Sequence, residues 1–275
     1  MTGSPVIPEA SVNGSVNDSL LRVESLTCRF GGLTAVDGLS FSLQSGDITS
    51  LIGPNGAGKT TVFNALTGIV RPQKGTVKLN DTTITGRPPH VVTGLGIART
   101  FQNIRLFGEM TVLENAMAGQ HSRSTAGLVE SIVRTRRQRE EEARVIHEAR
   151  QALQLVGLRS DLDQKAWTLP YGEKRRLEIA RAIASHPILL LLDEPAAGMN
   201  QQETSTLVEV IRRIREAGVT VLLIEHQMRL VMEISDTVLV MDQGQLISAG
   251  PPAAVQEDPQ VLAAYLGADW EQAAV

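Results

Sequence analysis

The feature that most constrains this chain is the run Gly-Pro-Asn-Gly-Ala-Gly-Lys-Thr-Thr at residues 53–61. The apolar run at 50–52 leads into it, and the segment at 61–66 that follows has the composition of a helix. Glycines let the backbone curl so that successive N–H groups point inward, and the helix behind them adds the positive end of its dipole. A strand, this glycine loop and a helix in that order predict a P-loop, which binds nucleotide phosphates.

The polar side chains of the loop have separate expected roles. Lys59 is placed to reach the β and γ phosphates as a point charge. Thr60 supplies a hydroxyl for Mg²⁺, and Thr61 can donate to the α-phosphate. We therefore expect nucleotide contacts from Gly53, Pro54, Asn55, Gly56, Ala57, Gly58, Lys59, Thr60 and Thr61. The alternative is a glycine turn that joins a strand to a helix and binds nothing.

Length and composition narrow the class of protein. The 275 residues are enough for one large α/β domain, or for a domain with a smaller lobe. Acidic residues outnumber basic ones by 30 to 26, so the overall charge does not favour a polyanionic partner, and we expect no nucleic acid. Cys28 is the single cysteine, which excludes an intrachain disulfide and a thiolate metal cluster and suits a reducing cytosol.

Two segments bear on targeting. Residues 1–20 carry neither a basic region nor an apolar one, so we expect a disordered tail rather than a signal peptide. The longest uninterrupted aliphatic run, at 188–192, is far shorter than the roughly 20 residues that a membrane span needs. We expect a chain that does not cross a bilayer unaided.

Apolar runs predict a mixed sheet. The runs at 188–192 and 219–224 are continuously apolar and lie on either side of a helical pattern, as expected for parallel strands covered on both faces. The first few runs and the last two are short and separated by turns, which favours antiparallel edges. Strands are expected at 21–26, 39–43, 48–52, 76–79, 188–192, 219–224, 237–241 and 245–249.

Helical spacing dominates two other regions. Between about 111 and 158 no strand pattern survives, and apolar residues recur at helical spacing, which predicts a helical lobe. After Gly250-Pro251-Pro252, the segment at 253–266 has the pattern of a short helix.

Acidic residues follow one of the expected buried strands. Asp193 and Glu194 come directly after the aliphatic run, and ligands of open α/β sheets bind at that edge. We expect Asp193 to hold Mg²⁺ through water and Glu194 to polarise a water that attacks the γ-phosphate. The next strand ends before His226, a candidate γ-phosphate contact. A histidine at a strand end, taken alone, is more often structural.

A further segment carries a resemblance to a known family. Residues 169–178, Leu-Pro-Tyr-Gly-Glu-Lys-Arg-Arg-Leu-Glu, form a glycine turn that opens a helix and could hold another phosphate. Together with the P-loop, Asp193-Glu194 and His226, this segment makes residues 21–250 resemble an ATP-binding cassette (ABC) ATPase. The resemblance implies ATP and Mg²⁺ as cofactors. It also implies an α/β fold of the P-loop NTPase type, with a mixed-sheet core, an antiparallel β subdomain and a helical subdomain.

The resemblance implies a domain organisation and site roles. The ABC ATP-binding domain would span 21–250, with a helical subdomain inserted at about 103–168 and a C-terminal helical extension at 251–275. Phe30 matches the aromatic residue that stacks on adenine. The signature residues, which in this family face the nucleotide of a second subunit, are Tyr171, Gly172 and Glu173. The catalytic set would be Lys59, Gln102, Glu194 and His226, and the metal set Thr60, Gln102 and Asp193.

Details of the motifs narrow the subfamily. The signature reads Leu-Pro-Tyr-Gly-Glu at 169–173 where the family has Leu-Ser-Gly-Gly-Gln, and Asn200 stands where many members have aspartate. The segments Ala-Arg-Thr-Phe-Gln-Asn-Ile-Arg-Leu-Phe at 98–107, Ile-Glu-His-Gln-Met at 224–228 and Ala-Tyr-Leu-Gly at 264–267 resemble ATP-binding subunits of branched-chain amino-acid importers. Importers of urea and short amides share much of this pattern.

The expected function is that of a cytoplasmic ATPase subunit, peripheral on the inner face of the cell membrane. It would drive import of branched-chain amino acids or of a related small polar solute. Its partners would be a second ATP-binding subunit, identical or, as the resemblance implies, different, two membrane-spanning permeases and, indirectly, a substrate-binding protein. Two alternatives are open: a soluble ABC ATPase acting on nucleic acid or ribosomes, and a nucleotide-binding regulatory module without turnover. The first usually has a second cassette or a long coiled coil, and neither occurs here.

Overall fold

The computed structural model describes residues 19–120, 136–158 and 161–266. The expected tail at 1–20 lies outside these residues except for Ser19 and Leu20, which already belong to the first strand. Residues 267–275 of the expected C-terminal extension also lie outside them. The boundaries at 21, 103, 168 and 250 stay predictions.

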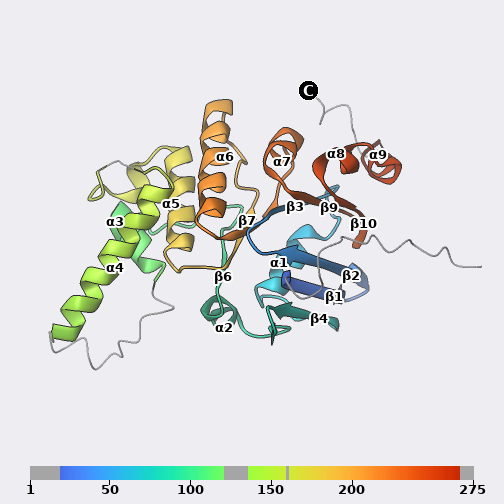
Figure 1. The fold of residues 1–275 in the computed structure, drawn as a ribbon, viewed down its shortest axis with the longest axis horizontal. Coiled ribbons are helices and arrows are strands. Elements are labelled where there is room, and N and C mark those ends of the chain that lie inside the picture. Colours follow the sequence, from blue (N-terminus) through green and yellow to red (C-terminus); the bar gives the residue numbers. More distant parts are fainter. Residues whose placement is uncertain (1–18, 121–135, 159–160, 267–275) are drawn as a thin grey trace, which may run out of the picture.

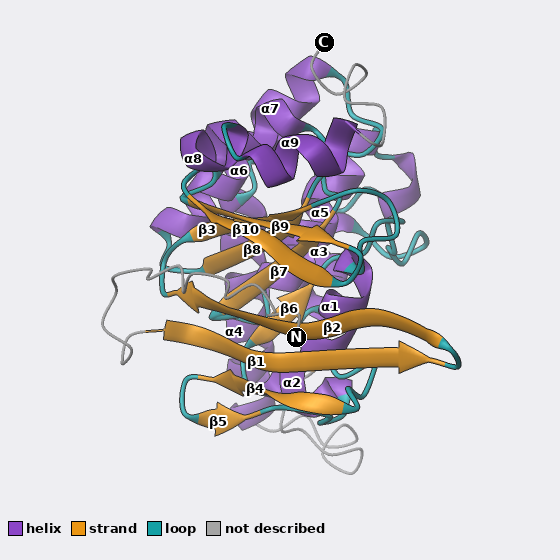
Figure 2. Cartoon of the chain, turned by 90° about the vertical axis from the view of Figure 1, so that its right-hand side faces the viewer, coloured by secondary structure: helices purple, strands orange, loops and turns teal. Residues whose placement is uncertain are grey.

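Two sheets form separate layers (Figure 2). The antiparallel sheet has the order β2-β1-β4-β5, and the mixed sheet has the order β10-β9-β3-β8-β7-β6. The strands of the first sheet are β1 (Ser19–Phe30), β2 (Leu33–Gln44), β4 (Lys74–Leu79) and β5 (Thr82–Thr83). Those of the second are β3 (Ile48–Ile52), β6 (Ile97–Arg99), β7 (Leu189–Asp193), β8 (Thr220–Ile224), β9 (Thr237–Asp242) and β10 (Gln245–Gly250).

Helices cover the mixed sheet and build a lobe beside it (Figure 1). The helices are α1 (Lys59–Leu66), α2 (Pro89–Gly94), α3 (Val112–Ala118), α4 (Arg136–Leu155), α5 (Tyr171–Ile183), α6 (Gln201–Glu216), α7 (Met228–Ile234), α8 (Pro252–Gln256) and α9 (Pro259–Leu266), with a 3₁₀ turn at Ala166–Thr168. Helices α3 and α4 pack against α5. Among the described residues, no helix combines the length and apolarity that crossing a bilayer requires.

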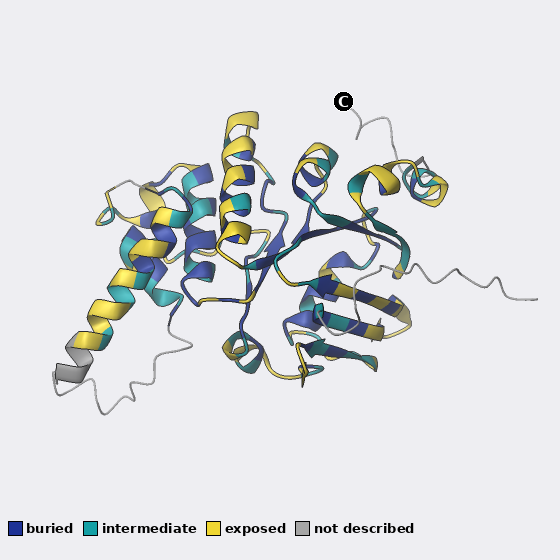
Figure 3. Cartoon of the chain, in the orientation of Figure 1, coloured by how far each residue is buried: buried dark blue, intermediate teal, exposed yellow. Residues whose placement is uncertain are grey.

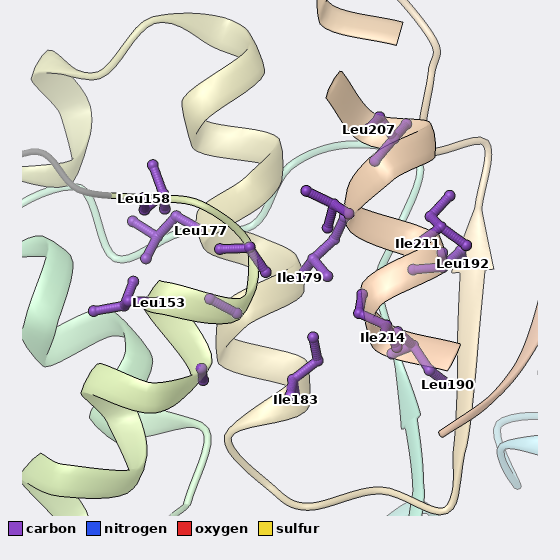
Figure 4. Close-up of a cluster of buried hydrophobic side chains, with 14 of the residues drawn as sticks. Leu153, Leu158, Leu177, Ile179, Ile183, Leu190, Leu192, Leu207, Ile211 and Ile214 are labelled. Carbon is purple, nitrogen blue, oxygen red and sulfur yellow. The ribbon is translucent and has the colours of Figure 1, made fainter. Parts of the chain in front are cut away.

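Strand β7 is buried on both of its faces, which is why its sequence shows no alternation of polar and apolar residues. Its five residues are all buried, and they alternate between two hydrophobic cores. Leu190 and Leu192 pack with α5 and α6, as Figure 4 shows, whereas Leu189 and Leu191 pack with α1 and the antiparallel sheet. Figure 3 shows the mixed sheet buried between these layers. The prediction of parallel strands covered on both faces is therefore confirmed for β7 and β8.

Several expected elements differ in extent. Strands β1 and β2 are longer than the expected runs, because their outward residues are polar and exposed while their inward residues pair along an antiparallel ribbon with several irregularities. Strand β6 was not expected, since three residues give no period to read. Strand β10 is an antiparallel edge as expected, but β9 also pairs in parallel with β3. The expected helix at 253–266 is two helices, because Pro259 has no N–H and begins a new one.

Arg175 joins the helical lobe to the segment that follows β6. Its side chain is fully buried, and its guanidinium donates to the carbonyl oxygens of Phe101 at 2.8 Å and Gln102 at 2.7 Å. It also pairs with the buried carboxylate of Glu178 at 2.8 Å. A buried charge is stabilised by such hydrogen bonds, so the bonds of the two terminal nitrogens fix the backbone of Phe101 and Gln102 relative to α5.

The position of β7 depends on its apolar contacts, which yields a test. We expect Leu190→Ala to lower the free energy of unfolding by about 3 kcal/mol, because the fully buried side chain leaves a cavity between β7 and the helices. The matched control is Ile188→Ala, at a side chain that is 37% exposed, which should cost less than about 1 kcal/mol. Denaturant unfolding measures both, and equal losses would contradict this account of the core.

Candidate nucleotide site

The loop at 53–58 has a backbone that requires glycine at two positions. Gly53 and Gly58 have φ angles of 147° and 100°, which other residues rarely adopt. A Cβ atom on Gly53 would lie 2.0 Å from the carbonyl oxygen of Met241, and one on Gly58 would lie 2.3 Å from that of Ala35. The loop is therefore pressed against β9 and β2, which leaves its other side for a ligand.

The start of α1 suits an anion. Gly58 occupies the N-cap position and has no side chain with which to accept the first N–H groups of the helix. Thr60 is exposed and Thr61 is half-buried in the same turn. Phosphate oxygens can accept from such N–H groups and gain from the helix dipole. The residues present therefore fit a nucleotide phosphate.

Lys59 is folded back into the loop. Its side chain is buried, and its Nζ donates to the carbonyl oxygens of Gly53 at 2.6 Å and Pro54 at 2.8 Å. Burial lowers the pKa of Lys59, and the nearby Glu194 carboxylate opposes that shift. An ammonium that is partly desolvated gains more from an arriving anion than one in water would.

The Glu194 side chain contacts two residues that follow neighbouring strands of the mixed sheet. Its Oε2 accepts from Gln102 Nε2 at 2.7 Å, and its Oε1 lies 2.8 Å from His226 Nε2. Gln102 follows β6, Glu194 follows β7 and His226 follows β8, and these strands are neighbours in the sheet. The structure thus brings together three of the residues that the sequence marks as catalytic.

The backbone of Glu194 is itself unusual. Its φ of 46° is rare for a residue with a side chain and costs conformational energy. Its N–H donates to the Ile224 carbonyl oxygen at 2.9 Å, which holds the turn against β8. The turn directs the carboxylate toward Gln102 and His226, where it is 20% exposed.

Asp193 has a partner that the sequence did not reveal. Its Oδ2 lies 2.7 Å from Arg99 Nη2, and the two side chains are only 7% and 6% exposed. Arg99 Nη1 also donates to Asn64 Oδ1 of α1 at 2.8 Å, and the guanidinium lies over the rings of Phe63 and Phe101. Arg99 therefore links β6, β7 and α1. An arginine at the end of an apolar strand, in the segment before Gln102, is the signal that could have suggested it.

Glu225 is a second residue that sequence reasoning missed. It is 3% exposed, and its carboxylate accepts from the N–H groups of Ala196 at 2.8 Å and His226 at 3.1 Å. Burial raises the pKa of Glu225, although these backbone donors oppose the shift. The bonds join the loop after Glu194 to the end of β8, which positions His226. The sequence shows an acidic residue directly before His226, but it does not show that the Ala196 N–H would be its partner.

The signature segment lies on the other face of the mixed sheet. Helix α5 packs in the core that contains Leu190 and Leu192, and α1 packs in the core that contains Leu189 and Leu191. Tyr171 donates its hydroxyl to the Ala197 carbonyl oxygen at 2.8 Å, in the loop after β7. The space beside Gly172 is filled by the Glu203 carboxylate of α6. Glu173 lies in the first turn of α5. The expected role of these residues toward a nucleotide stays a prediction.

Two further residues noted in the sequence, Asn200 and Phe30, lie at the start of α6 and at the end of β1. Asn200 caps α6: its side chain accepts from the N–H groups of Gln202 and Glu203, both at 3.0 Å, and Glu203 accepts from the Asn200 N–H at 3.0 Å. Asparagine is as good an N-cap as aspartate, so this departure preserves the local structure. Phe30 ends β1 and is 48% exposed, which leaves its ring free to stack on a base.

The residues expected to bind Mg²⁺ fit a particular kind of metal site. Thr60 offers an exposed hydroxyl, Asp193 has one carboxylate oxygen on Arg99 and a second beside it, and Gln102 offers an amide. Among the residues with described positions, no group of three or more His, Cys, Asp or Glu could hold a metal. So sparse a set of oxygen ligands suits Mg²⁺, which keeps several waters and is bound largely through substrate phosphates.

Removing the Arg99 charge tests whether the Arg99–Asp193 pair stabilises the contact between β6 and β7. We expect Arg99→Met to lower the free energy of unfolding by about 3 kcal/mol, because Asp193 is left buried without its cation. Adding Asp193→Asn should recover part of the loss. The control is Arg212→Met, whose surface pairs with Glu209 and Glu233 should together be worth less than about 1 kcal/mol. Calorimetry compares the four proteins, and a double variant no more stable than Arg99→Met would argue against a charge effect.

Comparisons with known proteins agree with this geometry. A family model described as ABC transporter matches residues 36–197, and one described as branched-chain amino acid ATP-binding cassette transporter matches residues 245–271. The chain is 45% identical to the high-affinity branched-chain amino acid transport ATP-binding protein LivG of Salmonella typhimurium, over 92% of this chain and 99% of that protein. It is also 45% identical to BraF, described in the same words, of Pseudomonas aeruginosa, over 90% and 98%.

Solved structures give the same assignment. The ADP conformation of an ATP-binding cassette from an ABC transporter superposes with a TM-score of 0.79 at 34% identity, covering 90% of this chain and 99% of that one. A nucleotide-free cassette superposes with a TM-score of 0.78 at 33% identity, over 90% and 98%. The P-loop, the three strand ends at Glu194 and the agreement along most of the sequence lead to one conclusion: the chain belongs to the ABC transporter family, as an ATP-binding cassette of that family.

Proposed function

We propose that this chain is the ATP-hydrolysing subunit of a membrane importer for branched-chain amino acids. The observation that carries the catalytic part is the Glu194 carboxylate held between Gln102 and His226, at the same sheet edge as the P-loop. The substrate follows from the relatives, which are named as branched-chain amino acid transport proteins and align with nearly the whole chain.

The P-loop residues supply the binding part of the proposed mechanism. The N–H groups of Gly53 and of residues 55–61 would surround the phosphates, since Pro54 has no N–H. Lys59 would turn from the carbonyl oxygens of Gly53 and Pro54 toward the β and γ phosphates, and Phe30 would stack on the adenine. Thr60, Gln102 and Asp193 would hold Mg²⁺, which neutralises developing charge on the phosphates when bound. Arg99 holds the Asp193 carboxylate in place for that role.

Glu194 supplies the chemical part. One carboxylate oxygen faces Gln102 and the other faces His226, and each oxygen retains a lone pair that can accept from a water. Glu194 polarises that water for in-line attack, while Gln102 and His226 orient the carboxylate and the γ-phosphate. Lys59 offsets the charge that develops on the phosphate oxygens.

A second ATP-binding subunit completes the site in this proposal. Tyr171, Gly172 and Glu173 begin α5, which packs on the opposite sheet face from α1. A single chain therefore does not place its signature on its own P-loop, and the nucleotide would be enclosed by the signature of another subunit, more readily a related chain than a second copy. Two permeases would receive the resulting motion, and a substrate-binding protein would deliver the solute outside. The subunit would lie on the inner, cytoplasmic face of the membrane.

A cavity next to Gln102 suits a permease segment. Its volume is about 700 Å³, and it is lined by residues of the segment after β6 and of α5, including Arg105, Leu106, Phe107 and Arg181. Phe107 is 51% exposed, an uncommon state for so large an apolar side chain. Leu106 packs partly into the helical core, so it serves both the lobe and the cavity. A permease helix docked here would sense the position of Gln102.

Catalysis by Glu194 can be tested directly. Glu194→Gln should retain ATP binding but release phosphate at least about a hundredfold more slowly, because the amide cannot act as the base. Lys59→Ala should instead weaken ATP binding, and Glu209→Gln, at an exposed residue of α6, is the matched control that should behave as the wild type. Phosphate release and equilibrium ATP binding separate the three variants. Turnover near the wild-type rate in Glu194→Gln would refute the assignment.

The solute can be tested in cells. Deletion of this gene should abolish high-affinity uptake of radiolabelled leucine, isoleucine or valine, because permeases without their ATPase cannot be energised. Expression of the wild-type chain should restore uptake and expression of Glu194→Gln should not. Uptake of urea and of a short amide is measured in the same strains. Loss of urea or amide uptake with normal leucine uptake would favour the related importers instead.

A further inference from the structure

The first turns of helix α5 contact the two segments that carry Gln102 and Glu194. Gln102 lies in the segment after β6, and Glu194 begins the turn after β7. The bond of 2.7 Å between Gln102 Nε2 and Glu194 Oε2 lies at an exposed site, where water competes for both groups. The backbone on each side of this bond must therefore be held by other contacts if the two side chains are to stay together.

Arg175 supplies these contacts on the Gln102 side. Its side chain is fully buried, and its terminal nitrogens donate to the carbonyl oxygens of Phe101 at 2.8 Å and Gln102 at 2.7 Å. The two peptide units that flank the Cα of Gln102 are thus both held by a single planar guanidinium. The Arg175 Nε has no hydrogen-bond partner in the part of the chain that the structure describes, so Nη1 and Nη2 make the polar contacts that orient it.

Tyr171 supplies the corresponding contact on the Glu194 side. Its hydroxyl donates to the Ala197 carbonyl oxygen at 2.8 Å, and the Ala197 N–H donates to the Glu194 carbonyl oxygen at 3.2 Å. Tyr171 lies one turn before Arg175 on the same face of α5, and Arg175 Nη2 is 3.5 Å from its hydroxyl oxygen. One face of one helix therefore holds both segments, and with them the distance between Gln102 and Glu194.

Glu178 holds Arg175 from the next turn of the helix. Its carboxylate is 1% exposed and lies 2.8 Å from Arg175 Nη1, and its second oxygen accepts from the Arg105 N–H at 3.3 Å. Burial raises the pKa of Glu178, and the charge of Arg175 opposes that shift. Glu178 also lines the cavity next to Gln102, so this buried pair connects the wall of the cavity to the Gln102 backbone.

We propose that Arg175 is a positioning residue for the reaction, which holds the two peptide units flanking Gln102 so that the Gln102 side chain reaches Glu194. This inference rests on the proposed roles of Gln102 and Glu194 in ATP hydrolysis. Without the guanidinium, the two peptide units lose their hydrogen bonds, and the Gln102 amide leaves the carboxylate for part of the time. The P-loop makes none of these contacts, so nucleotide binding itself is preserved.

The test replaces the buried pair in two ways. Arg175→Met/Glu178→Gln removes both charges together, so neither is left buried without a partner, and the glutamine can still accept from the Arg105 N–H. Arg175→Lys keeps a cation beside Glu178, but its single nitrogen cannot reproduce the separate contacts of the guanidinium. Phosphate release is measured with each full-length chain, in the assembly in which the wild type hydrolyses ATP.

The expected effect is on turnover rather than on binding. The double variant should lower kcat at least about tenfold, since a displacement of about 1 Å in a catalytic group can lower a rate about a hundredfold. Arg175→Lys should lower kcat about fivefold, the effect of one hydrogen bond, whereas the Kd for ADP without Mg²⁺ should stay within about twofold in both variants. The NMR signal of the Gln102 side-chain amide, identified by its absence in Gln102→Ala, should move toward that of a free amide.

Gln102→Ala distinguishes positioning from a general loss of structure. Because Arg175 acts through the Gln102 side chain, adding Arg175→Met/Glu178→Gln to Gln102→Ala should lower kcat less than about twofold further. The control is Leu177→Ala, at a fully buried residue of the same helix that packs in the helical core (Figure 4). It should lower the midpoint of denaturant unfolding but leave kcat and the Gln102 amide signal as in the wild type.

Three outcomes would overturn the role of Arg175. They are a kcat within about twofold of the wild type in Arg175→Met/Glu178→Gln, the same fold loss with and without Gln102→Ala, and an equal loss of kcat in Leu177→Ala. If the double variant does not fold, the same criteria apply to Arg175→Lys. A wild-type rate in Gln102→Ala would instead overturn the proposed role of Gln102, and this inference with it.

Discussion

A buried pair of opposite charges, Arg99 and Asp193, determines the geometry of the reactive sheet edge. A carboxylate and a guanidinium that are both removed from water cost free energy unless they meet at good geometry and use their remaining donors. Arg99 meets much of that condition, because its Nη1 donates to Asn64 and its guanidinium lies over two aromatic rings, although its buried Nε has no partner among the described residues. Because Gln102 follows Arg99 by three residues and Glu194 follows Asp193 directly, the pair also fixes the spacing that allows the 2.7 Å bond between Gln102 and Glu194.

In the P-loop, the buried charge is the ammonium of Lys59, and it too has protein partners in place of water. Lys59 is buried with two carbonyl oxygens in place of water, and these accept from two of its three N–H donors. Neutral carbonyls stabilise an ammonium less than a phosphate does, so an arriving triphosphate can displace them. The loop is thus ordered before a ligand arrives, and the Lys59 side chain can change partners while the glycine backbone stays where β2 and β9 hold it.

Local patterns predicted the parts of the fold that local physics determines. The glycines of the P-loop, the aliphatic runs of β7 and β8 and the residues after them follow from backbone sterics and from burial on two faces, and the structure places Glu194 beside His226 as neighbouring strands require. The predicted strand boundaries were wrong where the hydrophobic pattern is weak. Strand β6 has only three residues, and the polar outward faces of β1 and β2 hide their full length.

Buried polar residues with distant partners are the part that the sequence could not show. Arg99 pairs with a carboxylate 94 residues away, and Glu225 accepts from an N–H 29 residues away. Each of these residues looks like a surface or strand-end residue until the sheet order is known. Both act on the backbone or on a carboxylate of the site rather than on a ligand. Motifs therefore predict the side chains expected at the ligand. The side chains that hold them in place become evident only when the sheet order brings the ends of β6, β7 and β8 to the same edge.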